Sequence, residues 1–286
     1  MTPTLPRDIE IQTRYLRIAA RQWGDPNGVP VMAIHGWLDN AASFDALAPL
    51  LTGMNLIAVD MPGHGRSEHR PPGTPYHFID SIPDVLAIAD ALDWPRFSLL
   101  SHSLGAGISA IVAGTAPQRI RRLVLIEGLG PWSGSAEESP ERLSEATNHI
   151  LYKERRRAPS YPTVEEAAHA REKAGDLGFE AAMMLAGRGT YGIGDRVAWR
   201  TDPRLTYRSP LYLTEEQVGA FLPRISAPTL LIWGESGLDS PLQNLEERKK
   251  LVPDLIFQRI PGGHHLHMDN PEPVAAVVQP FLVPVT

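Results

Sequence analysis

The sequence predicts an α/β fold in which a mostly parallel central sheet is flanked by helices, with a helical cap inserted after the sixth strand. Short apolar runs recur along the chain, and each ends in turn residues and leads into a helical pattern. Such runs are typical of parallel strands that are buried on both faces. A length of 286 residues is sufficient for one large domain with an inserted subdomain.

The first predicted strands form an antiparallel pair at the edge of the sheet, in residues 8–28, where apolar residues alternate loosely before a turn. Six further runs are predicted to form the rest of the sheet. They are residues 29–36 (VPVMAIHG), 54–63 (MNLIAVDMPG), 96–103 (RFSLLSHS), 122–128 (RLVLIEG), 228–235 (PTLLIWGE) and 255–263 (LIFQRIPGG).

The segment between the fourth and fifth of these runs has no comparable strand and is predicted to be helical. Ser139 is a suitable N-cap before a proline, and Thr214 with Gln217 has the spacing of a capping box. We expect a core of residues 1–130 and 223–286 and a helical cap of residues 131–222. A cap inserted here would cover the carboxyl edge of the sheet, where parallel sheets bind ligands.

A candidate nucleophile follows the strand at 96–103, in Ser101-His102-Ser103-Leu104-Gly105. The pattern G-x-S-x-G places a serine on a tight turn between a strand and a helix, and here its first glycine is Ser101. Because a hydroxymethyl group is small, we expect the turn to be preserved. The helix that begins near Leu104 would offer oriented N–H groups to a developing oxyanion.

With this turn, the chain resembles the α/β-hydrolases over essentially its full length. The motifs that carry the resemblance stand in the family's order: HGW at His35–Trp37, DMPGHGRS at Asp60–Ser67, the turn at Ser103, and GGHHLHMDNPE at Gly262–Glu272. SHSLGAG, LLIWGESGLDS and PGGHHLHMDNPE are similar to segments of the serine hydrolase-like proteins. The resemblance implies structural roles for His35, Asp60 and His64.

The resemblance also implies the other catalytic groups. The oxyanion hole would consist of the backbone N–H groups of Trp37 and Leu104, with the Trp37 side chain as packing. Three histidines compete for the role of base, and His264 is expected because it follows a glycine and precedes the Pro-Glu pair. His265 and His267 would then line the pocket or the helix start.

The acid of the triad has two candidates. Family members commonly place an aspartate three residues after the glycine of the strand at 228–235, and here that residue is Gly237. Asp239 lies two residues further on. Glu127 ends a strand that is expected to be buried, where a carboxylate costs several kcal/mol unless it is paired. We favour Glu127, as in certain haloalkane dehalogenases, over Asp239, and an incomplete triad is the third possibility.

These residues predict a serine hydrolase that cleaves carboxylic esters or related acyl compounds through an acyl-enzyme, without a cofactor. One alternative is a C–C bond hydrolase of dienoate ring-cleavage products, with the dienoate carboxylate bound by Arg188 or Arg196. Another is a ligand-binding protein that keeps the fold without turnover, which the vacant acid position would explain.

Composition and charge exclude several kinds of site and of binding partner. The chain has no cysteine, which excludes disulfides, thiolate metal sites and a cysteine nucleophile. Three histidines near the C-terminus could ligate a metal, but no carboxylate has a recognisable ligand spacing, so we expect no metal site.

A net charge of −6, with one short basic run at Lys153–Arg157, argues against nucleic acid as a partner. The absence of a signal-peptide pattern and of a transmembrane-length apolar run predicts a cytoplasmic location without a membrane partner.

Overall fold

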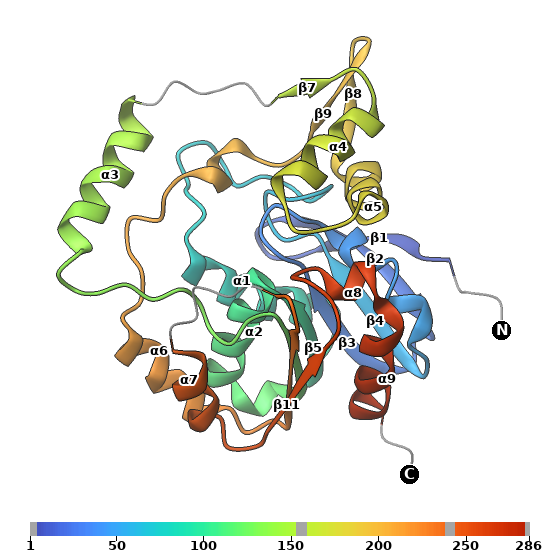
Figure 1. The fold of residues 1–286 in the computed structure, drawn as a ribbon, viewed down its shortest axis with the longest axis vertical. Helices are drawn as coiled ribbons and strands as arrows, with labels where there is room; N and C mark the ends of the chain where they lie inside the picture. Colours follow the sequence, from blue (N-terminus) through green and yellow to red (C-terminus); the bar gives the residue numbers. More distant parts are fainter. Residues whose placement is uncertain (1–4, 153–158, 238–243, 284–286) are drawn as a thin grey trace.

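A computed structural model describes residues 5–152, 159–237 and 244–283. Asp239 and Lys153–Arg157 lie outside these ranges. The central sheet has eight strands in the order β1-β2-β4-β3-β5-β6-β10-β11 (Figure 1). The strands are β1 (Arg7–Gln12), β2 (Arg17–Gly24), β3 (Val29–Ile34), β4 (Met54–Val59), β5 (Phe97–His102), β6 (Ile120–Ile126), β10 (Thr229–Gly234) and β11 (Leu255–Ile260).

The sheet is parallel except at one edge. β1 pairs antiparallel with β2, and β2 pairs antiparallel with β4, whereas every other neighbouring pair in the sheet is parallel. The predicted edge pair and the mostly parallel sheet are therefore confirmed. Six adjacent parallel strands, from β4 to β11, consequently direct their carboxyl ends to the same edge of the sheet.

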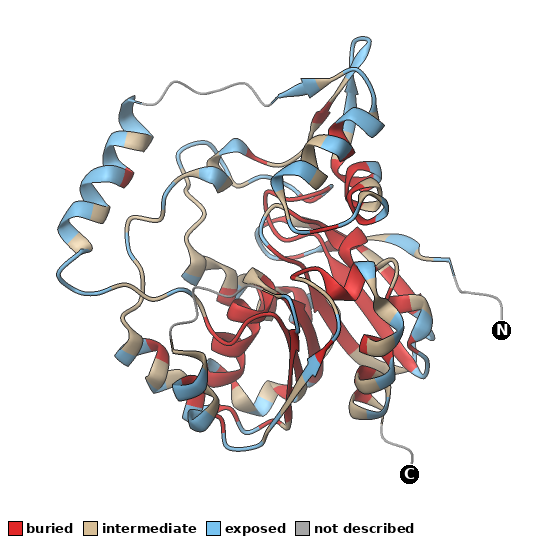
Figure 2. Cartoon of the chain, in the orientation of Figure 1, coloured by how far each residue is buried: buried red, intermediate tan, exposed pale blue. Residues whose placement is uncertain are grey.

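Two hydrophobic clusters cover the two faces of the sheet. In β6, Leu123 and Leu125 belong to one cluster, while Val124 and Ile126 belong to the other. This alternation follows from the two-residue period of a strand. Figure 2 shows the buried residues gathered in the sheet and in the helices that flank it.

Helices contribute to both clusters. Those described are α1 (Ser81–Ala91), α2 (Leu104–Thr115), α3 (Ser139–Tyr152), α4 (Val164–Ala174), α5 (Phe179–Gly189), α6 (Glu215–Phe221), α7 (Leu245–Leu251), α8 (Leu266–Asp269) and α9 (Pro271–Leu282). Short 3₁₀ helices are η1 (Ala41–Phe44), η2 (Ala48–Leu50), η3 (Phe78–Asp80), η4 (Pro117–Arg119), η5 (Pro203–Thr206) and η6 (Leu222–Arg224). Among the described helices, none has the length and apolar character needed to cross a bilayer.

The segment after β6 holds α3 to α6, and the expected capping box of α6 is present, with Thr214 and Gln217 bonded in both directions. It also holds strands that the sequence did not predict: β7 (Ser160–Tyr161), β8 (Thr190–Ile193) and β9 (Arg196–Trp199) form a small antiparallel sheet. These strands have two to four residues and are largely exposed, so they lack the apolar run that marks a core strand.

The helices of this segment differ in how they pack. α4 and α5 share a small hydrophobic cluster that includes Leu185, and Met268 of α8 joins it. α3 stands away from the sheet in Figure 1, and Ala146 is its one buried residue. Val218 of α6 packs into one of the two main clusters.

Candidate active site

Ser103 lies on the tight turn between β5 and α2. Its φ of 51° and ψ of −113° place it in a sparsely populated region, which costs about 1–3 kcal/mol and is typical of active sites. The Ser103 N–H donates to the carbonyl of Ile126 at 2.8 Å. Gly105 is needed for the close approach of α2 to β3, because a Cβ there would lie 2.7 Å from the carbonyl oxygen of His35. Neighbouring strands therefore hold the turn in its strained conformation.

The serine at the first glycine position of the motif has a partner. Ser101 is fully buried, and its Oγ lies 2.6 Å from Oγ of Ser109 on α2. A hydrogen bond removes the cost of burying this hydroxyl group, so the departure from glycine does not distort the turn.

Three side chains from three loops form a continuous hydrogen-bonded chain. His264, between β11 and α8, has Nε2 at 3.0 Å from Ser103 Oγ and Nδ1 at 3.1 Å from Glu127 Oε2. Since a carboxylate is an acceptor only, Nδ1 carries the proton, and Nε2 is left to accept from the serine hydroxyl. This is the relative arrangement of nucleophile, base and acid in a hydrolytic triad.

Glu127 follows β6 with a φ of 56°, and it is almost completely buried. Its Oε1 accepts a hydrogen bond from the N–H of Gly234, the last residue of β10, at 2.5 Å. Gly237 lies beside it, and a Cβ on Gly237 would come within 2.6 Å of Glu127 Oε2. The carboxylate of Glu127 thus occupies the space where a side chain at position 237 would begin. Asp239, the other candidate, lies outside the described residues.

The two expected oxyanion donors lie after β3 and directly after the nucleophile. Leu104 is the first residue of α2, and Trp37 follows β3. Within the described ranges, the N–H groups of Trp37 and Leu104 donate to no other protein group. The Trp37 side chain was expected to be buried packing, and this expectation is wrong. The side chain is 53% exposed, and its Nε1 donates to the carbonyl of Leu205 at 3.1 Å.

The three residues expected to have structural roles are buried away from this chain of hydrogen bonds. His35 Nε2 accepts from the N–H of Met61, and Asp60 accepts from the N–H groups of Ala41 and Arg66. Burial lowers the pKa of His64 to about 3, so this imidazole is neutral.

Neither arginine considered for a dienoate carboxylate is available to bind one. Arg188 is 1% exposed and pairs with Asp60 and Asp8. Arg196 donates to the backbone and side chain of Ser160 within the small sheet. The sequence could not show these partners, because they lie far from either arginine along the chain.

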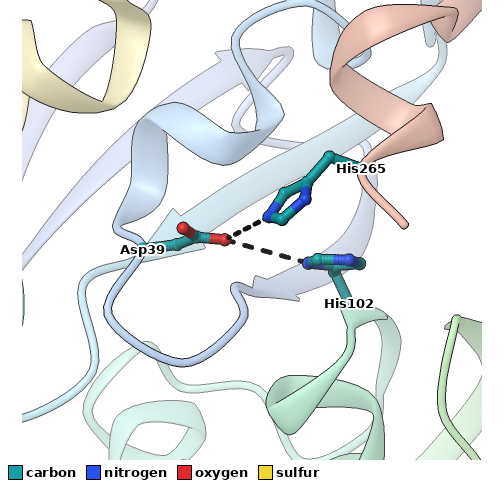
Figure 3. Close-up of side chains that lie close together, drawn as sticks. All are labelled: Asp39, His102 and His265. Atoms are coloured by element: carbon teal, nitrogen blue, oxygen red, sulfur yellow. Dashed lines mark ion pairs between the residues drawn. The ribbon is translucent and has the colours of Figure 1, made fainter. Parts of the chain in front are cut away.

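Figure 3 shows a cluster of buried polar side chains, Asp39, His102 and His265. The rings of its two histidines lie 4.7 and 5.1 Å from the ring of His264. Asp39, His102 and His265 bring three potential metal-ligating atoms within 4.8 Å of one another. The sequence motifs did not assign Asp39 or His102 any role; their only signal is their place in the HGW loop and the serine turn. Arg171 donates to Asp39 Oδ1 at 2.8 Å and already balances its charge. A divalent cation here would leave a large uncompensated positive charge, so the cluster does not fit a metal.

The contacts of His265 favour a proton on both ring nitrogens. Nδ1 lies 2.7 Å from the carbonyl oxygen of Asp176, and Nε2 lies 3.5 Å from Asp39 Oδ2, and both oxygens are acceptors only. Burial lowers the pKa of His265, but the hydrogen bond and charge of Asp39 and the carbonyl of Asp176 outweigh burial and raise it. The same ion pair, together with Arg171, lowers the pKa of Asp39.

The ion pair predicts a pH-dependent contribution to stability. Because the pKa of His265 is higher in the folded state, its contribution is complete below the unfolded value of 6.5 and is lost as the pH rises through the folded pKa. The free energy of unfolding of His265→Gln, compared with wild type from pH 5.5 to 9, should show a deficit that shrinks as the pH rises. A deficit that is constant across this range would contradict an imidazolium at His265.

Comparisons with known proteins identify the family of this chain. The family model of the alpha/beta hydrolase fold matches residues 29–172. Serine hydrolase-like protein 2 of Homo sapiens is 30% identical, over 98% of this chain and 95% of that protein. A hypothetical protein of Pseudomonas aeruginosa PAO1 is 40% identical, with a TM-score of 0.92 over 98% of this chain and 99% of that one.

A thioesterase domain from the curacin biosynthetic pathway is 26% identical, with a TM-score of 0.84 over 96% of this chain and 99% of that domain. The relative and the two solved structures each match at least 96% of this chain, whereas the family model ends within the inserted segment. The chain therefore belongs to the α/β-hydrolase family, and within it to the serine hydrolase-like proteins.

Proposed function

We propose that this protein is a serine hydrolase that cleaves carboxylic esters or related acyl compounds through an acyl-enzyme. The observation that carries the proposal is the chain of hydrogen bonds from Ser103 through His264 to Glu127, at 3.0 and 3.1 Å. The serine hydrolase-like relatives support hydrolysis, and the thioesterase domain supports an acyl substrate.

The reaction begins when Ser103 Oγ attacks the acyl carbon and its proton passes to His264 Nε2. Glu127 stabilises the resulting imidazolium through Nδ1 and keeps the ring in the required tautomer. The N–H groups of Trp37 and Leu104 donate to the oxyanion of the tetrahedral intermediate, a contribution of about 10²- to 10³-fold for one such donor. His264 then returns the proton to the leaving group.

Deacylation follows the same steps in reverse. His264 Nε2 accepts a proton from water, the hydroxide adds to the acyl carbon, and the second tetrahedral intermediate forms at the same two N–H groups. Collapse expels Ser103 Oγ, which regains its proton from His264, and releases the carboxylic acid. The proton transfers between Ser103 and His264 use two atoms, Oγ and Nε2, that already lie 3.0 Å apart in the free protein.

Two alternatives have less support. A C–C bond hydrolase would need a cation for the dienoate carboxylate, and Arg188 and Arg196 both have other partners. A ligand-binding protein without turnover was suggested by the missing acid at Gly237. The carboxylate of Glu127 fills that space, which favours turnover over this alternative.

A fluorophosphonate probe tests the proposal without knowledge of the substrate, because phosphonylation reports an activated serine. Wild type should form one adduct at neutral pH, and mass spectrometry should map it to Ser103. Ser103→Ala should form none, while Ser98→Ala, which removes a buried hydroxyl group that has no hydrogen-bond partner among the described residues, should still label. Labelling of wild type no faster than Ser103→Ala would refute an activated serine.

A further inference from the structure

The backbone of His264 is held on both sides by side chains that the proposed reaction does not use. Its N–H donates to Asp176 Oδ2 at 2.9 Å, and its carbonyl accepts from His102 Nε2, also at 2.9 Å. His102 ends β5 in the core, whereas Asp176 follows α4 in the inserted segment. The turn that presents the imidazole to Ser103 is therefore held between two parts of the fold.

Asp176 makes a second contact with the same turn. Its backbone carbonyl accepts from Nδ1 of His265, so Asp176 contacts two consecutive residues, one through its side chain and one through its backbone. Gly263 completes the fit, because a Cβ there would lie 2.8 Å from Asp176 Oδ2. The absence of a side chain at Gly263 lets the carboxylate reach the N–H of His264.

The inserted segment is anchored near Asp176 on both sides. Arg171 of α4 pairs with Asp39, whose other carboxylate oxygen faces His265 and His102 (Figure 3). On the other side, the N–H of Gly178 donates to Asp269 of α8 at 3.1 Å. These contacts tie Asp176 to the core, so its position follows the position of α4 and α5.

We propose that Asp176 is a positioning residue for His264, through which the seating of the inserted segment sets the reactivity of Ser103. The inference rests on the proposed function, because it assigns His264 the role of base. Its physical basis is distance: the imidazole must stay about 3 Å from the serine hydroxyl, and a misplacement of about 1 Å can cost on the order of 10²-fold in rate. Loss of the carboxylate would release the N–H of His264 and let the turn move.

Three variants test this role. Asp176→Ala removes the acceptor, Asp176→Asn keeps an amide oxygen in its place, and Asp195→Ala removes an exposed carboxylate from the turn between β8 and β9 of the same segment. The fluorophosphonate labelling rate should fall roughly tenfold to hundredfold in Asp176→Ala, the size expected for a hydrogen bond to a charged group. Asp176→Asn should restore most of the rate, and Asp195→Ala should match wild type.

Hydrogen–deuterium exchange of the peptide that contains His264 gives a readout independent of activity. Exchange of its backbone N–H should be faster in Asp176→Ala than in wild type or Asp195→Ala. Equal labelling rates in Asp176→Ala and Asp195→Ala, or unchanged exchange, would overturn the positioning role. If Asp176→Ala fails to fold, the labelling rate of Asp176→Asn decides. A folded Asp176→Asn protein keeps the acceptor, so a labelling rate far below that of wild type would contradict the positioning role. Absence of labelling in wild type would instead indicate failure of the proposed function.

Discussion

Replacing Glu127 by glutamine should lower kcat for ester hydrolysis about 10³- to 10⁴-fold, because the imidazole loses both its tautomeric control and the charge that stabilises imidazolium. Glutamine has the size of glutamate, so the fold should be retained. If its amide N–H₂ faces Nδ1 of His264, Nδ1 must accept and the ring proton moves to Nε2, which then cannot accept from Ser103. If the N–H₂ faces the N–H of Gly234 instead, two donors are set against each other.

The matched control is Asp239→Asn, which removes the other candidate acid. If Glu127 is the triad acid, this variant should keep kcat within a few-fold of wild type, as for most substitutions away from the reacting atoms. The two variants, Glu127→Gln and Asp239→Asn, together identify the acid. A loss of about 10³-fold in Asp239→Asn, with Glu127→Gln near wild type, would assign the acid to Asp239 and refute the role of Glu127.

The close approach of Glu127 and Gly237 allows a stricter test. In Glu127→Gly, the carboxylate is gone and glycine suits the positive φ of 56° at this position. Adding Gly237→Asp then places an acid at the position that the family commonly uses, in the space that the glutamate vacated. The double variant should recover at least about tenfold of the lost kcat, whereas Gly237→Asp in the wild-type background should be destabilising because two carboxylates would then compete for one space.

The nucleophile and base could be predicted from the sequence because each lies in a motif whose geometry is local. Ser103 depends on one tight turn, and His264 depends on a glycine before a short helix. Glu127 was suggested on energetic grounds, since a carboxylate at the end of a buried strand requires a partner. Its pairing with His264, 137 residues away along the chain, followed from the expected triad, but the sequence left open whether Glu127 or Asp239 makes that contact.

The groups that hold His264 could not be predicted in this way. Asp39, His102 and Asp176 are separated in the chain, and no local pattern links a loop after α4 to the turn before α8. The small sheet of β7, β8 and β9 was missed for a different reason. Its strands are short and largely exposed, so neither a hydrophobic period nor a continuous apolar run marks them.

Arg188→Met should reduce the free energy of unfolding by about 3–5 kcal/mol, which is the cost of leaving a buried charge without its partner. Arg188 Nε lies 3.0 Å from both carboxylate oxygens of Asp60, and Nη1 lies 2.6 Å from Asp8. Asp60 is fully buried, so removal of the guanidinium leaves its charge with only the backbone N–H groups of Ala41 and Arg66. The strong pairing also raises the pKa of Arg188 despite its burial.

Urea titration followed by tryptophan fluorescence measures this loss, with Arg196→Met as the control. Arg196 belongs to the same inserted segment but is exposed, so its replacement should change the free energy of unfolding by about 0.5 kcal/mol or less. The deficit of Arg188→Met should also persist at high salt, because buried charges are screened far less than exposed ones. Arg188 is one of several contacts between α5 and the core, which include the hydrogen bond from Asn40 to the carbonyl of Leu185 and the packing on Met268. A deficit no larger than that of Arg196→Met would mean that the ion pair does not stabilise the docking of the inserted segment.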